Sequence, residues 1–475
     1  MKIKLTVLAI SLLLLLNNLH SQKQDISWES LDSREIPEWF ENSKFGIFVH
    51  WGVYSVPSWR KLESAKYASY AEWYYSRVMD NEKNGGYDFH RKNYGQNFDY
   101  HDFAPMFKAE LFDANLWAEI FKKSGAKYVV LTAKHHDGYC LWDTENQHKK
   151  NWNSNDIGPK IDLLGNLTES VRNEGLKMGI YYSIPDWESI PRTAENTYFI
   201  DTKYVKKYGI SPERYVDEVC LPQLYELVSK YKPSLIFSDA GEWLYDAHFW
   251  KTKSFLNWLY NESPCKDEVV VNDRFFKGMP GKHGDYYSSE YKDADDKISN
   301  HPWEESRGIG GSYGFNRAEN LENYQTSKEL IHELISIVSR GGNLLLNVGP
   351  TADGRIPVIM QERLLDIGNW LEINGNAIYN TRKIQMNNRE NIDSSLYFTV
   401  NQDRLFCIFT NWSDEITFNL NSNKEIKNIK LLGYNDNLNW KIDPNNNIII
   451  DIPKLTINEI PCLHAWSIQI EFKGD

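Results

Sequence analysis

The sequence predicts an α/β fold: an irregular (β/α)8 barrel of the TIM type, followed by a small C-terminal antiparallel β-sandwich. Two observations in the 475-residue chain lead to this prediction. From residue 45 to about residue 347, short apolar runs that end in polar residues alternate with helix-like stretches, as in parallel sheets with helical crossovers. After about Arg382 the runs become short and are separated by turn residues, as in antiparallel sheets.

The eight candidate barrel strands follow one another at helix-compatible spacings over most of this region. They are Gly46–His50, Tyr128–Thr132, Lys177–Ser183, Leu235–Ser238, Val269–Val271, Tyr286–Glu290, a weak strand near Trp303, and Asn343–Asn347. Asp113 is the expected N-cap of one crossover helix, Gly125 its end, and Pro222 a kink in another. The stretches between strands five, six and seven are too short and polar for full helices, so we expect an irregular barrel there.

The C-terminal strands are separated by turns rich in Asn and Asp. They are Leu396–Val400, Leu405–Phe409, Ile416–Leu420, Ile426–Leu432, Trp440–Ile442, Ile448–Ile452 and Ala465–Phe472. This region contains no catalytic cluster, so we expect it to pack against the barrel.

The N-terminus has the order of a secretory signal peptide. Met1–Lys4 carries two lysines, Leu5–Leu16 is almost wholly apolar, and 17–22 is mostly polar. The apolar run is shorter than the roughly 20 residues that a membrane span needs, although an uncleaved anchor remains the alternative. We therefore predict a signal peptide over 1–21, a catalytic barrel over 22–382 and a sandwich over 383–475. The protein would be exported to the periplasm, the medium or a lysosome.

Composition narrows the class of ligand. The net charge of −12 argues against a nucleic-acid partner. The 17 Trp and 28 Tyr residues suit a carbohydrate protein, because aromatic rings stack on the apolar faces of sugars, although aromatics also fill cores. The five cysteines form no CxxC pair, and we expect free buried thiols.

Polar and ionisable residues gather where the candidate barrel strands end. A barrel brings the carboxyl ends of its strands to one rim, although the sequence separates them widely. The residues at these ends are His50, His135, His136, Asp137, Tyr181, Asp239, Arg274, Glu290 and Glu304. So many ionisable groups are hard to explain by stability alone, and we interpret the rim as an active site.

Asp239 and Glu290 supply a carboxylate pair from two different strands. Glycoside hydrolysis needs such a pair, because one group attacks the anomeric carbon while the other protonates the leaving oxygen. Arg274 would favour the ionised form of Asp239. A metal site at His135 and His136 is an alternative, but no HExxH-like spacing supports it. Both histidines can face the rim only if their strand ends there. We expect no metal and no cofactor.

Seven segments then carry a resemblance. They are FGIFVHWGVYSVPSW (45–59), AEWY (71–74), AKYVVLTAKHHDGYCLW (126–142), GIYYS (179–183), LIFSDAGEW (235–243), VVVNDR (269–274) and SRGGNLLLNVGPTADG (339–354). In this order they resemble the α-L-fucosidases of glycoside hydrolase family 29, over nearly the whole expected mature chain.

The resemblance implies a role for each matching residue. Asp239 resembles the nucleophile and Glu290 the acid/base, with Glu304 as the alternative acid/base. Some family members use an aspartate one residue after the Glu290 position, where this chain has Tyr291. The residues that would bind the sugar are His50, Glu72, Trp73, His135, His136, Tyr181, Arg274 and Tyr313, the last near the fucose methyl group.

We therefore expect a secreted, retaining, exo-acting α-L-fucosidase. Its partner would be a fucosylated glycan, with no nucleic acid and no membrane span in the mature form, and a homo-oligomer remains open. Two rival classes are a non-catalytic carbohydrate-binding protein on a degenerate barrel and a metal-dependent hydrolase. The loops over 60–70, 80–97 and 186–206 are expected to meet the leaving group, but they do not reveal its identity or the linkage.

Overall fold

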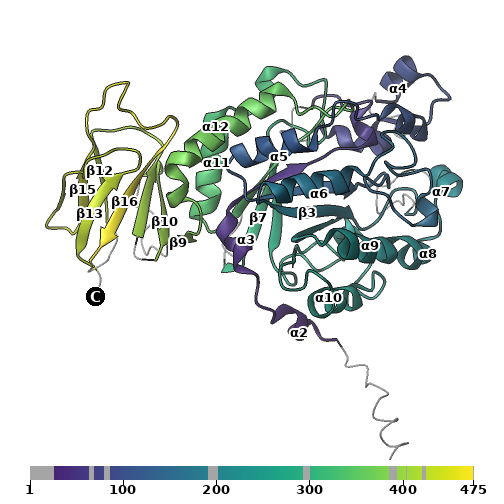
Figure 1. The fold of residues 1–475 in the computed structure, drawn as a ribbon, viewed down its shortest axis with the longest axis horizontal. Coiled ribbons are helices and arrows are strands. Elements are labelled where there is room, and N and C mark those ends of the chain that lie inside the picture. The colour runs from purple at the N-terminus through teal and green to yellow at the C-terminus, as the bar shows by residue number, and fades with distance from the viewer. Residues whose placement is uncertain are drawn as a thin grey trace, which may run out of the picture.

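The computed structural model describes residues 26–63, 69–79, 86–190, 200, 202–291, 300–384, 393–402, 404–419 and 424–473. The predicted signal peptide lies outside these residues. Figure 1 shows a larger α/β part and a smaller all-β part, with α11 (Ser327–Ser339) and α12 (Val358–Asn374) between them. Within the described ranges, no helix is both long enough and apolar enough to cross a membrane.

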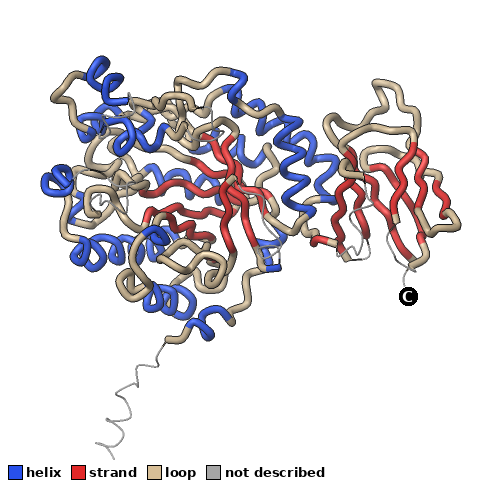
Figure 2. Tube along the Cα trace, turned by 180° about the vertical axis from the view of Figure 1, so that it is seen from behind, coloured by secondary structure: helices blue, strands red, loops and turns tan. Residues whose placement is uncertain are grey.

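The larger part is built on a parallel sheet of eight strands, and all eight expected strands are confirmed. They are β1 Phe45–Val49, β2 Tyr128–Lys134, β3 Lys177–Ser183, β4 Leu235–Asp239, β5 Val270–Val271, β6 Tyr287–Glu290, β7 Trp303–Gly308 and β8 Asn343–Val348. Their order is β5-β4-β3-β2-β1-β8-β7-β6. The sheet curls toward a barrel, and Figure 2 shows helices around the outside of its strands.

The irregularity predicted between strands five, six and seven is found between β5 and β6, whereas most of the connection between β6 and β7 lies outside the described residues. Strands β5 and β6 do not pair as a ladder; instead the carbonyl of Val271 accepts from the N–H groups of Asp285 (3.0 Å) and Tyr286 (3.3 Å). No helix forms over 272–286, all of which is described. This connection consists of turns and bends, and hydrogen bonds to the Val271 carbonyl link β5 to the start of β6.

The crossover helices are α5 Ala114–Lys123, α6 Leu163–Asn173, α9 Leu221–Tyr231, α10 Thr252–Asn261 and α11, and α12 follows β8. Other α-helices are α2 Trp28–Asp32, α3 Glu38–Ser43, α4 Gly86–Tyr94, α7 Thr202–Tyr208 and α8 Pro212–Tyr215. Short 3-10 helices span Val53–Ser55, Ala71–Trp73, Tyr100–Met106, Gln147–Lys149, Gly241–Trp243, Leu321–Asn323 and Gly375–Ala377, and π-helical turns span Tyr75–Met79 and Val216–Cys220.

Two local predictions about the helices have clear physical outcomes. The carboxylate of Asp113 accepts from the N–H groups of Asn115 and Leu116, as expected of an N-cap. Pro222 is preceded by a π-helical turn rather than a simple kink. A proline has no N–H to offer the carbonyl four residues earlier, that of Glu218, and Asn146 donates to this carbonyl instead at 2.7 Å.

Alternation along the strands decides which side chains enter the barrel. In β4, Leu235 and Phe237 belong to the interior cluster, whereas Ile236 packs outward against the helices. The interior cluster consists of Phe40, Phe48, Tyr128, Val130, Tyr181, Leu235, Phe237, Val270, Tyr286, Tyr313 and Leu345. Asp239 has the same parity as Leu235 and Phe237, so its side chain is directed to the mouth of the barrel.

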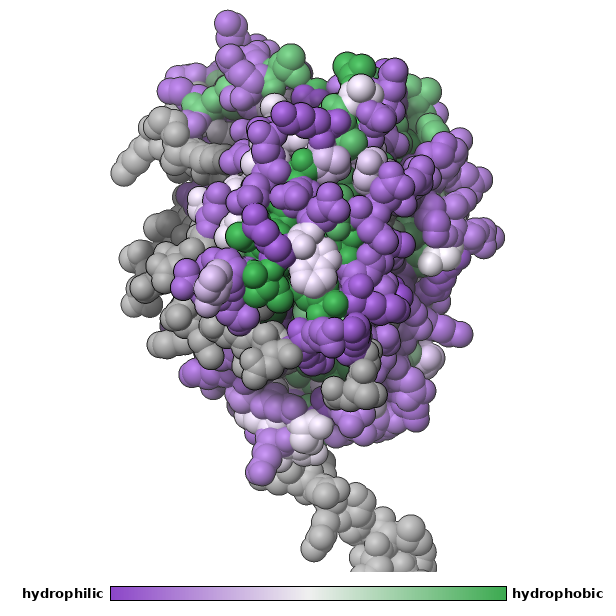
Figure 3. All heavy atoms as spheres, turned by 90° about the vertical axis from the view of Figure 1, so that its left-hand side faces the viewer, coloured by the Kyte–Doolittle hydropathy of each residue, from purple (hydrophilic) through white to green (hydrophobic). Residues whose placement is uncertain are grey.

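The C-terminal part is the predicted sandwich. Its sheets have the orders β13-β16-β11-β10-β9 and β12-β15-β14. The strands are β9 Arg382–Lys383, β10 Leu396–Asn401, β11 Arg404–Phe409, β12 Glu415–Phe418, β13 Ile426–Leu431, β14 Trp440–Ile442, β15 Ile448–Asp451 and β16 Trp466–Phe472. The outward face of this part is mostly hydrophilic, with a small apolar area near its centre (Figure 3).

The inner end of the sandwich packs on the last barrel helix. The indole of Trp370 in α12 donates to the carbonyl of Ala465 at 2.8 Å, and Thr399 donates to the carbonyl of Ala377 at 2.7 Å. The boundary that we predict between Arg382 and Lys383 falls within β9. All five cysteines are free thiols, four of them buried.

Candidate active site

One arginine joins the two predicted catalytic carboxyl groups at the carboxyl ends of the strands. Asp239 is the last residue of β4, Glu290 the last of β6, and Arg274 lies just after β5. Nη1 of Arg274 is 3.3 Å from Oδ1 of Asp239 and 3.2 Å from Oε2 of Glu290. Nε of the same guanidinium donates to Ser288 at 2.8 Å, which holds it between the two strands.

Asp239 lies in surroundings that favour its ionised form. Tyr181 donates to its Oδ2 at 2.7 Å, and Nε2 of His136 lies 3.6 Å from the same oxygen. Burial alone would raise the pKa of Asp239, but Arg274, His136 and Tyr181 together hold it below the ordinary value. Ala240, which follows, is in the left-handed region (φ 63°).

Glu290 lies in surroundings of the opposite kind. Burial raises the pKa of this carboxyl, and the negative charge of Asp239 raises it further, while Arg274 offsets part of the shift. Its side chain is 33 % exposed, against 14 % for Asp239. The two carboxyl groups therefore have pKa values shifted in opposite directions around one shared cation, an arrangement that separates a nucleophile from an acid.

Both histidines of the pair after β2 reach the site because the strand ends before them. The β2–β3 register shifts between Thr132 and Lys134, and β2 ends at Lys134. The ring of His135 stacks on that of Tyr181, with centroids 5.5 Å apart. Nδ1 of His135 is buried and has no hydrogen-bond partner within the described residues.

The hydrogen bonds around His136 fix its tautomer. Ser183 donates to the carbonyl of Pro185 at 2.6 Å, so its oxygen accepts from Nδ1 of His136, also at 2.6 Å. Burial lowers the pKa of His136 to about 4, which leaves the ring neutral near neutral pH. Its Nε2 therefore carries a lone pair beside Asp239, ready to accept a hydrogen bond from a hydroxyl group.

Hydrogen bonds also fix the tautomer of His50. Nδ1 of His50 lies 2.7 Å from the amide oxygen of Asn347, whose amide nitrogen donates to the carbonyl of Tyr313. Burial lowers the pKa of His50 to about 3. The ring of Tyr313 lies 4.7 Å from that of His50. The free nitrogen of His50 is a second hydrogen-bond acceptor.

A short 3-10 helix brings Glu72 and Trp73 to the same group of residues. Oε2 of Glu72 accepts from the N–H of Gly314 (2.8 Å) and from Ser312 (3.1 Å). Burial raises the pKa of Glu72 to about 8, so this carboxyl can donate as well as accept. The ring of Trp73 lies 5.4 Å from that of His136.

Glu304 lies away from this group, near the opposite end of the barrel. It is paired with Asn343, the first residue of β8, and accepts from the hydroxyl of Tyr128, the first residue of β2. In the β6–β7 register Glu290 is opposite Ser306, so Glu304 is two residues, or roughly 7 Å, deeper. The structure thus does not bring Glu304, the alternative acid/base, to Asp239. Glu304 is the second residue of β7, which begins at Trp303, whereas Asp239 is the last residue of β4.

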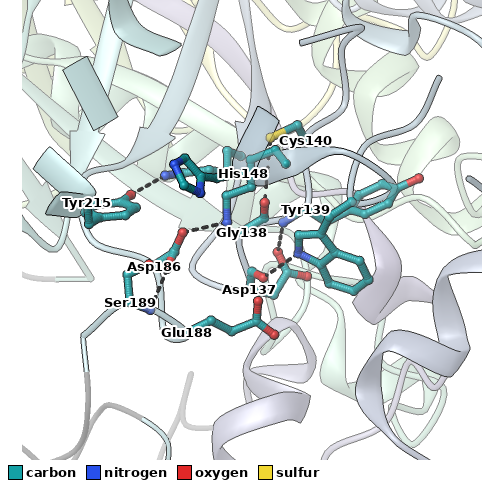
Figure 4. Close-up of polar contacts among 12 residues, drawn as sticks. Asp137, Gly138, Tyr139, Cys140, His148, Asp186, Glu188, Ser189 and Tyr215 are labelled. Atoms are coloured by element: carbon teal, nitrogen blue, oxygen red, sulfur yellow. Dashed lines mark hydrogen bonds and ion pairs between the residues drawn. The ribbon is translucent and has the colours of Figure 1, made fainter. Parts of the chain in front are cut away.

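Asp137, expected at the rim, turns into a buried network behind it (Figure 4). Its oxygens accept from Tyr100 at 2.7 Å and from the N–H of Tyr139 at 3.1 Å. In the same network Lys149 pairs with the fully buried Asp186 at 2.7 Å. Asp186 begins the loop that carries Trp187, and the backbone N–H of Trp187 donates to the carbonyl of His136.

Three residues of the site were not singled out from the sequence. The ring of Trp187 lies 5.3 Å from that of His136, and the ring of Trp243 lies 5.3 Å from His136 and 5.6 Å from Trp73. Glu242 is the third, a carboxyl close to Asp239 and Arg274. Glu242 and Trp243 end the run LIFSDAGEW, so their closeness to the candidate nucleophile was the available signal.

Within the described residues, no group of three or more His, Cys, Asp or Glu side chains has the arrangement of a metal site. The site consists of two carboxyl groups, a shared arginine and several neutral hydrogen-bonding groups, and aromatic rings line it.

Comparison with known proteins gives a consistent picture. A family model described as alpha-L-fucosidase matches residues 12–376, and one described as the alpha-L-fucosidase C-terminal domain matches 388–471. The chain is 40% identical to the tissue alpha-L-fucosidase of Homo sapiens over 93% of this chain and 91% of that protein. It is 42% identical to an alpha-L-fucosidase of Dictyostelium discoideum over 83% of this chain and 82% of that protein. The crystal structure of the alpha-fucosidase of Thermotoga maritima in complex with fucose is 35% identical and superposes with a TM-score of 0.77, over 94% of this chain and 99% of that one.

Proposed function

The chain belongs to the α-L-fucosidase family, glycoside hydrolase family 29, and on this premise we propose that it releases terminal α-L-fucosyl residues from glycans by a retaining double displacement. The observation that carries the proposal is the pair Asp239 and Glu290 on one guanidinium, with pKa values shifted in opposite directions.

The spacing of the pair supports retention. Two oxygens that contact one nitrogen at 3.3 and 3.2 Å lie at most about 6.5 Å apart. Retaining enzymes place these groups about 5–5.5 Å apart, whereas inverting enzymes leave about 6.5–9.5 Å for a water molecule. The shared arginine thus favours direct attack by Asp239 on the anomeric carbon.

The proposed reaction has two balanced steps. The Asp239 carboxylate bonds to the anomeric carbon as the bond to the leaving oxygen breaks, and Glu290 gives its proton to that oxygen. Glu290 then takes a proton from water, the water oxygen bonds to the anomeric carbon, and Asp239 is released. Glu304 is too deep in the barrel for this proton transfer, so we favour Glu290 as the acid/base.

The remaining predicted residues would hold the sugar. His50 and His136 present unprotonated nitrogens, and Glu72 presents a carboxyl that can donate. His135, Tyr181, Trp73 and Tyr313 complete the wall around Asp239. Neutral groups of this kind suit the hydroxyl groups and ring of an uncharged sugar.

The first test is release of a phenol from aryl α-L-fucopyranoside, with aryl α-L-galactoside and β-D-galactoside as comparators. We expect strong release from the fucoside, weak release from the α-L-galactoside and none from the β-D-galactoside. Proton NMR during the first turnovers should show α-L-fucose before the β anomer appears. First formation of the β anomer would exclude retention, and no release from any substrate would exclude the activity on simple fucosides.

We also propose that the protein is exported, on the strength of the charged, apolar and polar order of residues 1–22. N-terminal sequencing of protein recovered outside the cytoplasm of an expressing cell should give a start near Gln22. Retention of the whole chain in the cell would argue against export.

A further inference from the structure

Arg274 is surrounded by more negative groups than the proposed reaction uses. Burial would lower the pKa of Arg274, but the carboxyl groups of Glu290, Asp239, Glu242 and Asp273 raise it well above its ordinary value. One positive charge cannot compensate four negative ones. Which of the four carboxyl groups carries a negative charge therefore depends on the hydrogen bonds that each of them accepts from other polar groups.

Three of these carboxyl groups have identified donors. Asp239 accepts from Tyr181 and Arg274, and Glu290 accepts from Arg274. Asp273 accepts from the N–H and hydroxyl of Ser288 through one oxygen and from the N–H of Gly281 through the other. Asp273 is thus satisfied without the guanidinium.

Glu242 differs from the other three. Its Oε2 is buried and has no hydrogen-bond partner within the described residues. A buried carboxylate oxygen without a donor is costly, whereas the neutral acid is tolerated. Burial raises the pKa of Glu242 to about 8; Asp239 and Asp273 add to this, while Arg274 and the backbone N–H of Glu242 offset part of it.

The backbone keeps Glu242 close to the segment after β5 that carries Arg274. Glu242 lies on the 3-10 turn Gly241–Trp243, directly after Asp239 and Ala240. A Cβ on Gly241 would lie 2.3 Å from the carbonyl oxygen of Phe275 and 2.7 Å from that of Arg274. The turn is therefore in backbone contact with the Arg274 segment, and Glu242 has little freedom to move away.

We propose that Glu242 is a positioning residue for the proposed reaction: as an uncharged acid, it leaves the guanidinium of Arg274 to Asp239 and Glu290. If Glu242 ionises, it competes for the same cation and draws it from the nucleophile. The charged groups that face it are Asp239 at the end of β4, and Asp273 and Arg274 after β5. Turnover should thus decline as Glu242 loses its proton. This inference rests on the proposed function.

The test uses 2,4-dinitrophenyl α-L-fucopyranoside, whose phenolate leaves without a proton. With this substrate kcat/KM reports the attack by Asp239 and is insensitive to the protonation of Glu290. For a group with a pKa of about 8, wild-type kcat/KM should fall about tenfold between pH 6 and pH 9. Return of the pH 9 samples to pH 6 before assay checks that the enzyme has not unfolded.

Variants separate the charge from the shape of the side chain. Glu242→Gln and Glu242→Met cannot ionise, so both should show a smaller alkaline decline than the wild type, with the remainder set by Glu72, whereas Glu242→Asp should keep the full decline. Glu119→Gln, an exposed helix position, is the matched control and should follow the wild type.

An alkaline decline in Glu242→Gln that superimposes on the wild-type curve overturns the proposal, as does a loss of kcat/KM of a hundredfold or more in Glu242→Gln at every pH. If the Gln variant fails to fold, the Met variant decides by the same criterion. A wild type that releases no phenol overturns the proposed function and this inference with it; an active wild type with unchanged variant profiles overturns this inference alone.

Discussion

At the scale of single residues, similar carboxyl groups behave differently because their neighbours differ. Asp239 lies against Arg274, His136 and Tyr181, which outweigh the effect of burial and lower its pKa. Burial dominates at Glu290 and raises its pKa, and burial raises the pKa of Glu304 to about 8 although Tyr128 donates to this carboxyl. The surroundings, not the residue types, therefore distinguish the proposed nucleophile from the proposed acid.

Azide should reveal which face each catalytic carboxyl occupies. Asp239→Gly should lower turnover of an aryl fucoside by several orders of magnitude, and azide should enter the vacated space to form β-L-fucosyl azide. Glu290→Ala with an activated substrate should instead form α-L-fucosyl azide, because azide attacks the glycosyl-enzyme from the other face. Product configuration is read by NMR. Formation of the α azide by Glu304→Ala, with none from Glu290→Ala, would reverse the acid/base assignment.

Removing the tyrosine donor to Asp239 should change the acid side of the pH profile. In the proposed mechanism Asp239 acts as the carboxylate, and its lowered pKa keeps that form present at low pH. Tyr181→Phe removes a hydrogen bond to the carboxylate, so the pKa of Asp239 rises and the acid limb of kcat/KM moves to higher pH. Tyr182→Phe, which faces Gln223 on the other side of the strand, is the control. An acid limb that stays in place, or moves to lower pH, would contradict this account.

At the scale of elements, the site depends on where strands end and on what anchors the loops after them. Strand β2 ends at Lys134, and this frees His135 and His136 to face the same way. The loop after β3 is held by the buried pair of Lys149 and Asp186. Gly138 permits this pair, because a Cβ there would lie 2.7 Å from Nζ of Lys149.

Breaking that pair on one side should destabilise the barrel strongly. Lys149→Met removes the ion-pair partner of the buried Asp186 carboxylate and leaves Lys134 as the remaining cation near it, which costs up to about 3–5 kcal/mol in the free energy of unfolding. The double variant Lys149→Met with Asp186→Asn removes both charges and should recover part of this loss. Urea unfolding measures both, and the exposed neighbour Lys150→Met is the control. A double variant no more stable than the single one would show that the charge is not the cause.

At the scale of the whole molecule, the sandwich and the barrel are joined through α12. Figures 1 and 2 both place α11 and α12 beside the sandwich, so one helix layer serves both parts. Trp370 is buried there and bonds to Ala465. We interpret the sandwich as a support for the last barrel helices, far from the site chemistry.

Truncating this tryptophan should uncouple the two parts. Trp370→Ala leaves a cavity and removes the indole donor to the carbonyl of Ala465, at a cost of about 3–5 kcal/mol. Thermal unfolding followed by calorimetry should show a lower midpoint and separate transitions for sandwich and barrel. Leu365→Ala, a more exposed position on the same helix, should change the midpoint little. A single unshifted transition in Trp370→Ala would mean that the interface contributes little to stability.

Much of the architecture follows from local patterns. The eight barrel strands and the sandwich strands β10 to β16 could be predicted from the sequence, because alternation, turn residues and caps are short-range properties, whereas the two-residue strand β9 was not predicted. The irregular closure was also predictable, since the connection over 272–286 is short and polar. The π-helical turn before Pro222 was not, because it depends on a carbonyl that finds Asn146 far away in the sequence.

The sequence by itself determined the fold class, the family resemblance and the set of polar residues at the strand ends. Only the tertiary structure decided which of them meet: Arg274 joins Asp239 to Glu290, Asp137 turns away, Glu304 lies deep, and Glu242 enters the group. The physical reason is that the positions of strands along the chain and the side-chain types at their ends depend on local sequence. Register, depth in the barrel and the sharing of one buried charge depend on contacts between distant segments.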